Sequence, residues 1–533
     1  MTHSKHVILL SFILVIQTIF FPFSQMYAQT PGQWAWEKGS DTSNYIGNFG
    51  TQGVADAANQ PPGLYEACEW TDLDGNFWLY GGNRINAFSD DLWKYDPVTA
   101  TWTWVRGHNS PNNRAVYGIQ GIPSPVNSPG LRTTSYSWVD HNGDLWLYGG
   151  LGYYDMNSAI PYSDLWRYNI ATNMWTWMKG DSGNSIAAPH YGSKGVEAPS
   201  NRPGAIDEMG IAWTSGNNDL WLLDYNGCLW KYRIATNSWT WMKGDTILYP
   251  APIYGTKGVA APNNTPGYNY FSYTRWKDHD NNLWYLEGGR MILWKYSIAS
   301  NMWTWVNGDT TDLIPYYGPM PCDHEDDTLR PQGRAETRAC WLDGCDNLWL
   351  MGGHGPYTSL NDLLYYDMSH DEWVWVDNDT TLRDTSIYGT LGSPGVSNTP
   401  SSRDGAVPFV DNAGHLWLFG GINSDATARF GDLWMYTIDT NCTRCHPTGI
   451  KDASKTSQVS FYPNPATSEI TVNGGQNYLE KVEVYDITGK KILQKEISKQ
   501  QDIIDLSGLK RGLYFVHLYV KDRGPTISKL MLN

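Results

Sequence analysis

The chain is poor in charge: 17% of its 533 residues are charged, and 54 Asp and Glu outnumber 38 Lys and Arg. This acidic balance argues against a general nucleic-acid binder, which needs a basic face for phosphates. No run reaches the roughly 20 apolar residues of a spanning helix, so we expect no transmembrane span in the mature chain. The sequence also lacks a Gly-x-Ser-x-Gly elbow, a His-Glu-x-x-His motif and a phosphate loop, so no catalytic residue is assigned.

Aromatic residues are abundant instead, with 28 Trp and 34 Tyr, which is too aromatic for a disordered chain. All the Trp lie before residue 450. Residues 451–533 carry 12 basic and 9 acidic residues, a net of +3, which leaves −19 for residues 1–450. Two segments that differ in charge and aromatic content predict two domains.

The N-terminus has the pattern of an export signal. Lys5 and His6 precede a largely apolar stretch from Val7 to Phe21, which is short for a membrane span but suits a signal peptide. We expect cleavage after Ala28, with residues 1–28 as the signal peptide. The alternative is a membrane anchor or a buried helix.

The tail alternates short strand-like runs with turn signals such as Asn473-Gly474 and Ser507-Gly508. The runs are 469–472, 481–485, 491–493, 502–506 and 512–519. This pattern predicts a small Ig-like β-sandwich of about 75 residues.

Four motifs give the tail a family resemblance: Phe461–Ala466, Val484–Lys490, Ile504–Leu509 and Gly512–Val516. Their order and spacing resemble the type A C-terminal sorting domain of the type IX secretion system of Bacteroidota. The resemblance implies Sec export, passage across the outer membrane with the type IX machinery as partner, and a secreted or cell-surface protein. We place a linker at 446–457 and the sorting domain at 458–533. An ordinary Ig-like accessory module is the alternative.

The middle of the chain contains one unit in six copies. In the first copy, Trp70 to Gly82 is followed by Asp91-Leu-Trp-Lys-Tyr95 and then by Trp102-Thr-Trp104. The copies begin at Trp70, Trp138, Trp213, Trp276, Trp341 and Phe409. Each reads as four antiparallel strands, a to d, of which strand d is the Trp-x-Trp element.

The sixth copy lacks its Trp-x-Trp element, whereas the chain begins with an unattached one, Trp34-Ala-Trp36. A closed ring would use this N-terminal strand to complete the last sheet. The sequence therefore predicts an all-β fold, a six-bladed β-propeller over residues 29–445 that is closed by an N-terminal strand.

The paired glycines, spaced Tyr and later Trp of each copy resemble the kelch repeat of galactose oxidase and kelch-like propellers. The resemblance covers about residues 33–441, and the third copy departs from it with Leu223-Asp224 in place of the glycines. Extra length lies between strands d and a, with a Tyr-Gly-x-x-Gly motif such as Tyr117–Gly121. We interpret these segments as ordered loops that pad one face.

The loops between strands b and c are long in copies one, two, five and six, which a closed ring makes neighbours. Surface loops on a rigid scaffold are where binding usually occurs. We therefore predict a ligand-binding sector; variable loops without a ligand are the alternative. Its residues are Arg84, Tyr153, Tyr154, Tyr162, His354, Tyr357 and Arg429.

Three motifs suggest cofactors, yet none is assigned. Cys442-x-x-Cys445-His446 matches a c-type haem attachment motif, but no helical pocket surrounds it, and a local disulfide suits an exported protein better. Asp72–Asn76 resembles the start of a Ca²⁺ loop without its distal Glu, so turn chemistry explains it better. Asp323–Asp327 reads as a solvated acidic loop, with a weak cation site as the alternative.

These observations predict an exported propeller that binds a protein or a glycan. Some kelch-like propellers are enzymes, so a carbohydrate-active enzyme with a site at the propeller axis is the alternative. A cluster of Arg, Glu, Asp, His or Tyr on the channel-lining strands would favour that alternative.

Overall fold

The computed structural model of the protein describes residues 31–110, 113–155, 158–182, 187–206, 208, 210–268, 272–311, 315–317, 322, 329–377, 385–443, 460–462, 466–473, 478–486, 490–520 and 526–532. The expected signal peptide, the linker at 446–457 and the acidic loop at 323–327 lie outside these residues. The chain forms two compact units, a larger one that ends at Thr443 and a smaller one that contains the tail.

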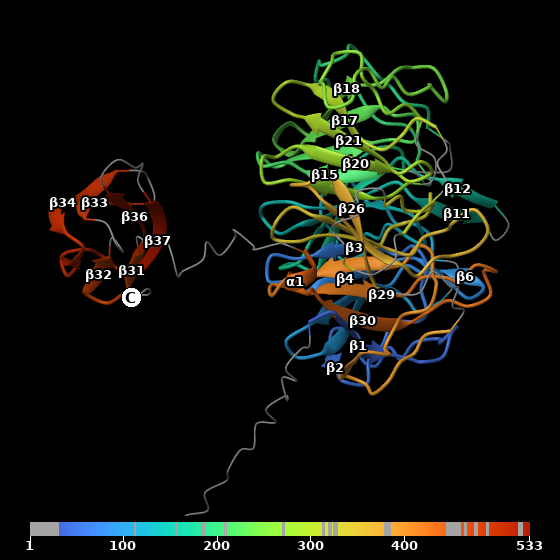
Figure 1. Cartoon of the computed structure of the whole chain (residues 1–533), viewed down its shortest axis with the longest axis horizontal. Coiled ribbons are helices and arrows are strands. Elements are labelled where there is room, and N and C mark those ends of the chain that lie inside the picture. Colours follow the sequence, from blue (N-terminus) through green and yellow to red (C-terminus); the bar gives the residue numbers. More distant parts are fainter. Residues whose placement is uncertain are drawn as a thin grey trace, which may run out of the picture. The chain divides into compact units, whose positions relative to one another are not determined.

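The described part of the larger unit is built from small antiparallel sheets, one for each copy of the repeat (Figure 1). From its outer edge inward, sheet 1 contains β2 (Ala55–Asp56), β8 (Thr101–Arg106), β7 (Leu92–Asp96), β4 (Phe77–Tyr80) and β3 (Cys68–Thr71). In the same direction, sheet 2 contains β14 (Met174–Lys179), β13 (Leu165–Asn169), β10 (Leu145–Tyr148) and β9 (Tyr136–Val139). Sheet 3 contains β18 (Ser238–Lys243), β17 (Leu229–Arg233), β16 (Asp219–Leu223) and β15 (Ile211–Thr214).

The remaining copies follow the same order. Sheet 4 contains β22 (Met302–Asn307), β21 (Ile292–Ser297), β20 (Leu283–Glu287) and β19 (Arg275–Lys277). Sheet 5 contains β26 (Glu372–Asp377), β25 (Leu363–Asp367), β24 (Leu348–Met351) and β23 (Cys340–Leu342). Sheet 6 contains β27 (Pro394–Gly395), β1 (Gln33–Gly39), β30 (Asp432–Thr437), β29 (Leu416–Phe419) and β28 (Val407–Val410).

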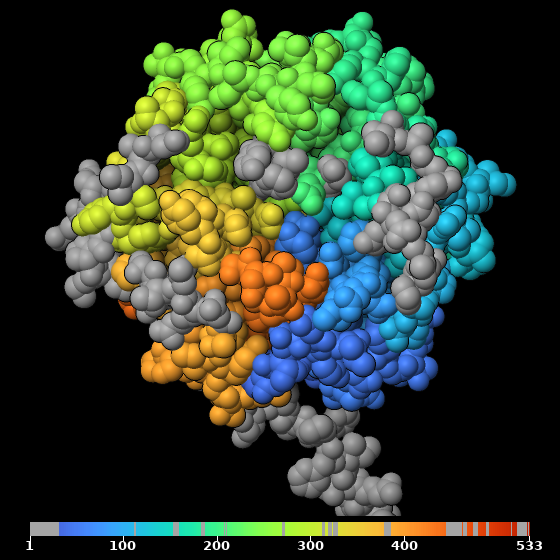
Figure 2. Space-filling model, turned by 90° about the vertical axis from the view of Figure 1, so that its right-hand side faces the viewer, coloured from blue at the N-terminus to red at the C-terminus, as the bar shows by residue number. Residues whose placement is uncertain are grey.

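The innermost strands adjoin one another in a closed circle, in the order β3, β9, β15, β19, β23, β28 and back to β3. Figure 2 shows the result: the sequence colours run around the face, and blue N-terminal residues lie beside orange residues from the end of the unit. The arrangement is propeller-like. Two hairpins project from the sheets, β5 (Asn83–Arg84) with β6 (Ala87–Phe88) and β11 (Leu151–Asp155) with β12 (Ser158–Pro161).

The N-terminal strand β1 pairs with β30, as the orphan Trp-x-Trp element predicts. Trp34 lies opposite Tyr436, and Trp36 lies opposite Trp434. Trp34 is fully buried, and its ring packs 5.1 Å from that of Tyr436. The first and last strands of the unit therefore share one sheet.

The repeated tryptophans join successive sheets. The indole of Trp70 in sheet 1 donates to the carbonyl of Trp146 in sheet 2 at 2.9 Å. The same bond recurs from Trp138 to Trp221, from Trp213 to Trp284 and from Trp341 to Trp417. Phe409 has no indole N–H, and its ring stacks instead on Phe77 of sheet 1, with centroids 4.6 Å apart. These large buried rings contribute apolar contact between the sheets.

The Tyr-Gly-x-x-Gly segments do not pad one face as expected; they lie along the outer edge of the sheets. Gly121 donates its N–H to Trp177 O of β14 at 2.7 Å, and Asn127 donates its side-chain amide to Trp175 O at 3.0 Å. Gly118 adopts a φ of +61°, where a Cβ would lie 2.4 Å from Asn127 Oδ1. The segments satisfy an edge strand that would otherwise expose unpaired backbone groups.

Two helical turns occur among the described residues, the 3-10 turn η1 (Ile234–Thr236) and α1 (Thr440–Thr443), and neither could span a membrane. Cys442 in α1 is bonded to Cys322, 120 residues earlier, with Cα atoms 5.2 Å apart. The expected local disulfide within Cys442–Cys445 is therefore wrong. Cys345 is also disulfide-bonded, whereas Cys68, Cys228 and Cys340 are free thiols.

The tail unit contains two antiparallel sheets. The first has β31 (Ser460–Tyr462), β32 (Glu469–Asn473) and β35 (Gln501–Asp505). The second has β34 (Lys491–Lys499), β33 (Leu479–Asp486), β36 (Gly512–Val520) and β37 (Thr526–Leu532). Both sheets contribute to one core that includes Val472, Val484 and Val516. The five expected runs are strands, and β31 and β37 are additional.

Candidate binding site at the axis

The candidate site lies where the chain enters the innermost strands, around the axis of the circle. Glu66, Thr134, Glu336 and Gly405 each adopt a left-handed backbone, with φ between +53° and +58°. The N–H of Gly405 donates to Glu336 O at 3.1 Å, that of Glu66 to Gly405 O at 3.1 Å, and that of Thr134 to Glu66 O at 3.2 Å. Left-handed backbone at non-glycine residues is strained, and such strain is typical of functional positions.

Side chains from different sheets meet across this axis. Tyr273, which precedes β19 of sheet 4, donates its hydroxyl to Glu66 Oε1 at 3.1 Å. Tyr65 donates to Glu336 Oε2 at 2.6 Å, joining the segments that lead into β3 and β23. Sheets 1 and 4 are opposite each other in the circle, so the first bond spans the axis.

An ion-pair cluster lies next to these hydrogen bonds. Arg275 and Arg338 both bind the carboxylate of Glu69, at 3.1 and 2.8 Å. Arg338 also donates to Ala67 O at 3.3 Å, and its guanidinium lies 5.1 Å from the ring centroid of Tyr273. Three sheets therefore share one buried cluster of opposite charges.

Burial and like charge shape the electrostatics of the cluster. Burial raises the pKa of Glu66 well above its usual value, and the neighbouring carboxylates of Glu208 and Glu336 raise it further. Burial also raises the pKa values of Tyr65 and Tyr273, so both phenols stay protonated and donate. The site therefore holds a carboxyl group that favours its neutral form beside other carboxylates.

A cavity of about 440 Å³ lies along the axis. It is lined by residues of all six innermost strands, from Glu69, Arg275 and Cys340 to Thr71, Lys277 and Val410. Of the ion-pair cluster, Glu69 and Arg275 thus form part of its wall. This volume is in the range of small-molecule sites.

Two predicted loop residues lie near the cluster. The Nδ1 atom of His354 forms a hydrogen bond with Asp404 Oδ2 at 2.9 Å. Burial raises the pKa of Asp404 to about 6, and the charge of Glu336 contributes to this rise. Arg429 donates from Nε to Asn83 Oδ1 at 3.1 Å. The Arg429 guanidinium also interacts electrostatically with Tyr65. Arg84 follows Asn83 in β5 and binds Asn109 Oδ1 at 3.3 Å.

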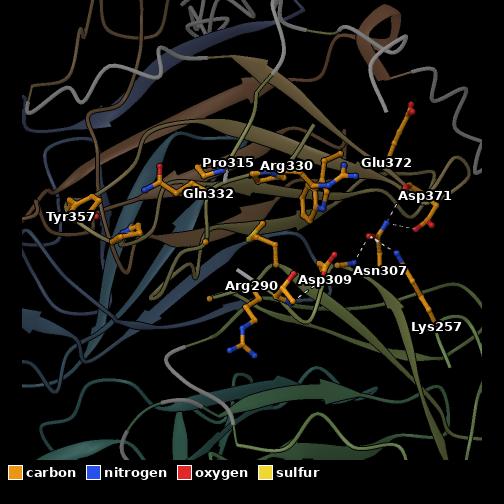
Figure 3. Close-up of a pocket in the computed structure, with 18 residues that line it drawn as sticks. Lys257, Arg290, Asn307, Asp309, Pro315, Arg330, Gln332, Tyr357, Asp371 and Glu372 are labelled. Atoms are coloured by element: carbon orange, nitrogen blue, oxygen red, sulfur yellow. Dashed lines mark hydrogen bonds between the residues drawn. The ribbon is translucent and has the colours of Figure 1, made fainter. Parts of the chain in front are cut away.

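The other predicted residues are not gathered there. Tyr162 is buried, with the Arg132 guanidinium 4.6 Å from its ring centroid. Tyr153 and Tyr154 belong to β11, but their side chains lie outside the described residues. Tyr357 is 93% exposed and lines a peripheral pocket of about 920 Å³, at the opposite end from Asp371 (Figure 3).

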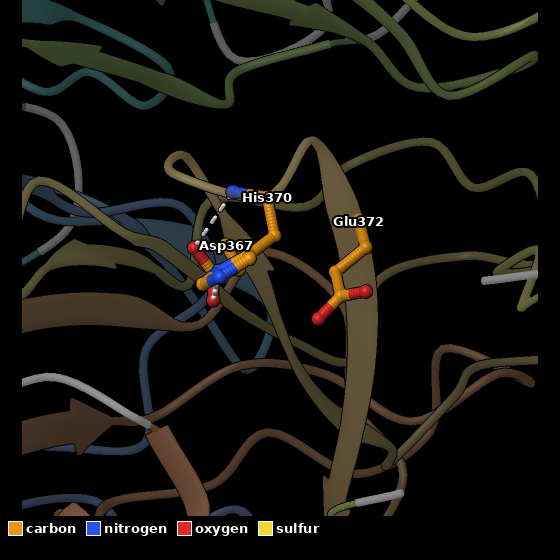
Figure 4. A group of neighbouring side chains, drawn as sticks. All are labelled: Asp367, His370 and Glu372. Carbon is orange, nitrogen blue, oxygen red and sulfur yellow. Dashed lines mark hydrogen bonds and ion pairs between the residues drawn. The ribbon is translucent and has the colours of Figure 1, made fainter. Parts of the chain in front are cut away.

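A second side-chain group lies at the turn between β25 and β26. Ligand atoms of Asp367, His370 and Glu372 are within 4.8 Å of one another (Figure 4). Asp367 Oδ1 accepts from the N–H and hydroxyl of Ser369 at 2.9 and 2.7 Å, and Oδ2 pairs with His370 Nδ1 at 2.9 Å. Asp367 therefore closes the turn, and no metal is assigned to it.

The cofactor motifs have structural roles. The Cys442 sulfur is bonded to Cys322, so it is not available for a haem thioether. Asp72 accepts from the Asp74 and Asn76 N–H groups at 3.0 and 2.9 Å and from the Trp78 indole at 2.7 Å. Its oxygens close the hairpin, and the turn interpretation holds for this residue.

Sequence reasoning missed the axial residues Glu66, Glu69, Glu208, Tyr273, Arg275, Glu336 and Arg338. A signal was present, because each lies within five residues before the aromatic residue that begins its copy. Reading those positions in register across the copies, rather than the loops, would have found them.

Residues 460–533 match the family model described as a secretion system C-terminal sorting domain. The tail is a secretion-system sorting domain. The protein is accordingly handled by the type IX secretion system and is secreted or carried to the cell surface. No curated protein matches the chain. A solved structure titled "Structure of YjhT" is similar at 15% identity over 72% of this chain and 97% of that chain, with a TM-score of 0.42.

Proposed function

We propose that residues 29–445 form a six-bladed kelch-type propeller and that residues 1–28 are a signal peptide. The circle of innermost strands and the pairing of β1 with β30 support this architecture. The linker would then be 446–457, and the sorting domain would begin at 458.

The function that the geometry supports best is a surface or secreted binding module whose ligand is a glycan. The carrying observation is the cross-axis cluster, where Tyr65, Glu336, Glu66 and Tyr273 bring phenols and carboxyl groups together beside Arg338. Sugar hydroxyls both donate and accept, so they match such mixed groups. A protein partner would need a larger continuous surface than an axial cluster offers.

Glycan-array binding by the full chain tests this proposal. We expect bound glycans whose signal falls at least about tenfold in Glu336→Gln, since an acceptor-only carboxylate is replaced. Glu480→Gln, an exposed change in the tail, is the control and should bind as the unaltered chain does. Binding that is indifferent to Glu336 would contradict the axial location.

A carbohydrate-active enzyme at the axis is the second candidate, favoured by one observation. Burial raises the pKa of Glu66 well above its usual value, which favours the neutral form of this carboxyl group beside the carboxylates of Glu208 and Glu336. A neutral acid next to carboxylates is a pairing that general acid–base catalysis uses. Product formation from a bound glycan would support catalysis if Glu66→Gln abolished it and retained binding. Binding without turnover would support the binding module and contradict the enzyme.

The ligand-binding sector predicted from the loops between strands b and c is proposed to form the rim of the same site. His354 and Arg429 are its best-placed members, through Asp404 and Tyr65. We expect alanine at either position to weaken glycan binding severalfold, whereas Tyr357→Ala, at the peripheral pocket, should leave it unchanged.

A further inference from the structure

The cavity of about 440 Å³ is distinct from the cross-axis hydrogen bonds. Each of the six innermost strands contributes three successive residues to its wall. The wall does not include the four residues that form the cross-axis hydrogen bonds, Tyr65, Glu66, Tyr273 and Glu336. The cavity is therefore a second candidate site, separate from the one proposed for a glycan.

The charged side chains of the wall are unevenly matched. Among the described residues that line the cavity, only Glu69, Arg275 and Lys277 are charged, so the wall carries a net charge of +1. The carboxylate of Glu69 is already bound to Arg275 through one oxygen and to Arg338 through the other, at 3.1 and 2.8 Å. Lys277 is half-buried and has no hydrogen-bond or ion-pair partner among the described residues. Its ammonium group is thus the positive charge that the wall leaves unmatched.

Trp276, between Arg275 and Lys277 in β19, departs from the repeat. At four equivalent positions the indole N–H donates to a carbonyl of the next sheet. Trp276 is 5% exposed, and its buried indole nitrogen has no hydrogen-bond partner in the described part of the chain. Its ring stacks on Trp284 of its own sheet instead, with centroids 5.2 Å apart. A buried donor without an acceptor costs free energy, which a ligand that supplies the acceptor would recover.

The wall next to β19 is mostly apolar. Strand β23 adjoins β19, and β28 adjoins β23. These two strands line the cavity with uncharged side chains that include Leu342, Pro408 and Val410. The thiol of Cys340 in the same wall is neutral, because burial raises its pKa. Unmatched donors and an apolar surface therefore lie side by side in one cavity.

Aspartates follow the lining residues in five of the strands, and none of them lines the cavity. Four of them accept the indole N–H of the Trp six residues later, at 2.7 to 2.9 Å: Asp72, Asp140, Asp278 and Asp411. The fifth, Asp343, accepts the N–H of Cys345 at 2.8 Å. These carboxylates are held in their own hairpins. Their charge around the axis keeps the expected preference for an anion modest.

We infer that the cavity binds a small apolar monocarboxylate. The ligand's carboxylate accepts from the Lys277 ammonium and the Trp276 indole, and its hydrocarbon part lies against the apolar wall of β23 and β28. One negative charge matches the net charge of the wall, and a carboxylate supplies acceptors for both donors. Hydrocarbon that leaves water for this wall adds to the affinity.

Four small probes test the site by calorimetry on the full chain: hexanoate, hexanamide, hexylamine and acetate. We expect hexanoate to bind about threefold to fivefold more tightly than neutral hexanamide, the size of one partly exposed ion pair. Hexylamine, a cation at neutral pH, should bind more weakly than hexanamide. Acetate should bind at least about tenfold more weakly than hexanoate, because it lacks the apolar chain.

Variants locate the two donors. Lys277→Met should bring the preference for hexanoate over hexanamide to about onefold. Lys94→Met is the matched control, because Lys94 is a half-buried lysine of β7 that does not line the cavity, and it should leave the preference intact. Trp276→Phe removes only the indole donor and should weaken hexanoate binding about twofold to tenfold. Phe409 at the equivalent position of the sixth copy shows that the fold accommodates this ring.

Three results would overturn the monocarboxylate site: no binding of hexanoate, equal binding of hexanoate and hexanamide, or a preference that survives Lys277→Met. Acetate that binds as tightly as hexanoate would overturn the apolar part of the site. The order of affinities in the unaltered chain decides these points even if a variant fails to fold. Glycan binding at the cross-axis cluster is tested separately by Glu336→Gln, which lies outside the cavity wall.

Discussion

The side-chain amide of Asn398 donates a hydrogen bond of 3.1 Å to the backbone carbonyl of Trp34, 364 residues earlier in the chain. Asn59, Asn127, Asn201 and Asn264 make the same bond to a Trp that follows them by 38 to 48 residues. Asn398 thus bonds to the N-terminal strand as the other four asparagines bond to the outer strands of sheets 1 to 4, so closure uses the same contact as those four sheet edges.

Trp34→Ala is therefore expected to destabilise the larger unit by about 3–5 kcal/mol, the usual cost of truncating a buried Trp. Trp34 is fully buried among residues such as Trp349 and Trp434. Trp36 on the same strand is only half-buried, so Trp36→Ala should cost less. Thermal unfolding followed by circular dichroism measures both. An equal effect of the two changes would argue against closure through Trp34.

A buried ion pair gives a second prediction. Arg403 binds both oxygens of Asp432 at 2.8 and 3.0 Å, and neither side chain is more than 1% exposed. Arg403→Met should cost about 3–5 kcal/mol because it leaves a buried carboxylate without its partner.

The control for this change is a more exposed pair. Arg167 lies 3.7 Å from Asp144 and is 32% exposed, so Arg167→Met should cost less than about 1 kcal/mol. Melting temperatures of both variants make the comparison. An equal loss of stability in the two variants would contradict the argument from burial.

How much the sequence could predict depended on the range of the interactions. The strands, their order and the pairing of Trp34 with the last sheet follow from local patterns that recur in each copy. The bond from Tyr273 to Glu66 joins residues 207 positions apart, and no repeat spacing specifies which side chains meet across a closed circle. The contacts between the axial residues could not be predicted for that reason, although the positions of these residues could have been read in register across the copies.

Cysteine pairing was misjudged on the same physical ground. Cys442 and Cys445 are close in sequence, whereas Cys322 lies 120 residues away and reaches α1 through the fold. Cys322 has a φ of +58° and donates its N–H to Trp375 O at 2.7 Å, the role that Gly121 has at Trp177.

Replacing Cys322 and Cys442 by Ser should lower stability by about 2–5 kcal/mol, because the bond closes a long loop in the unfolded chain. Since Cys345 is also disulfide-bonded, reductant alone would act on more than this bridge. The melting temperature of the double variant with and without reductant separates the effect of this bridge from the effect of the disulfide at Cys345. If the double variant had the same melting temperature as the unaltered chain, this bridge would contribute no stability.

The last prediction concerns the pH dependence that Glu66 imposes. Its pKa is raised in the folded protein, chiefly by burial, so its neutral form is favoured there. The corresponding stability is fully present below about pH 4.5 and is lost as pH rises through the folded pKa. Glu66→Gln, which stays neutral, should therefore gain thermal stability over the unaltered chain at pH 8 and show little gain at pH 4. Glu69→Gln is the contrasting change, since it leaves buried Arg338 without its carboxylate and should destabilise at pH 8. A Glu66→Gln gain that is equal at both pH values would mean that the carboxyl group does not titrate differently on folding.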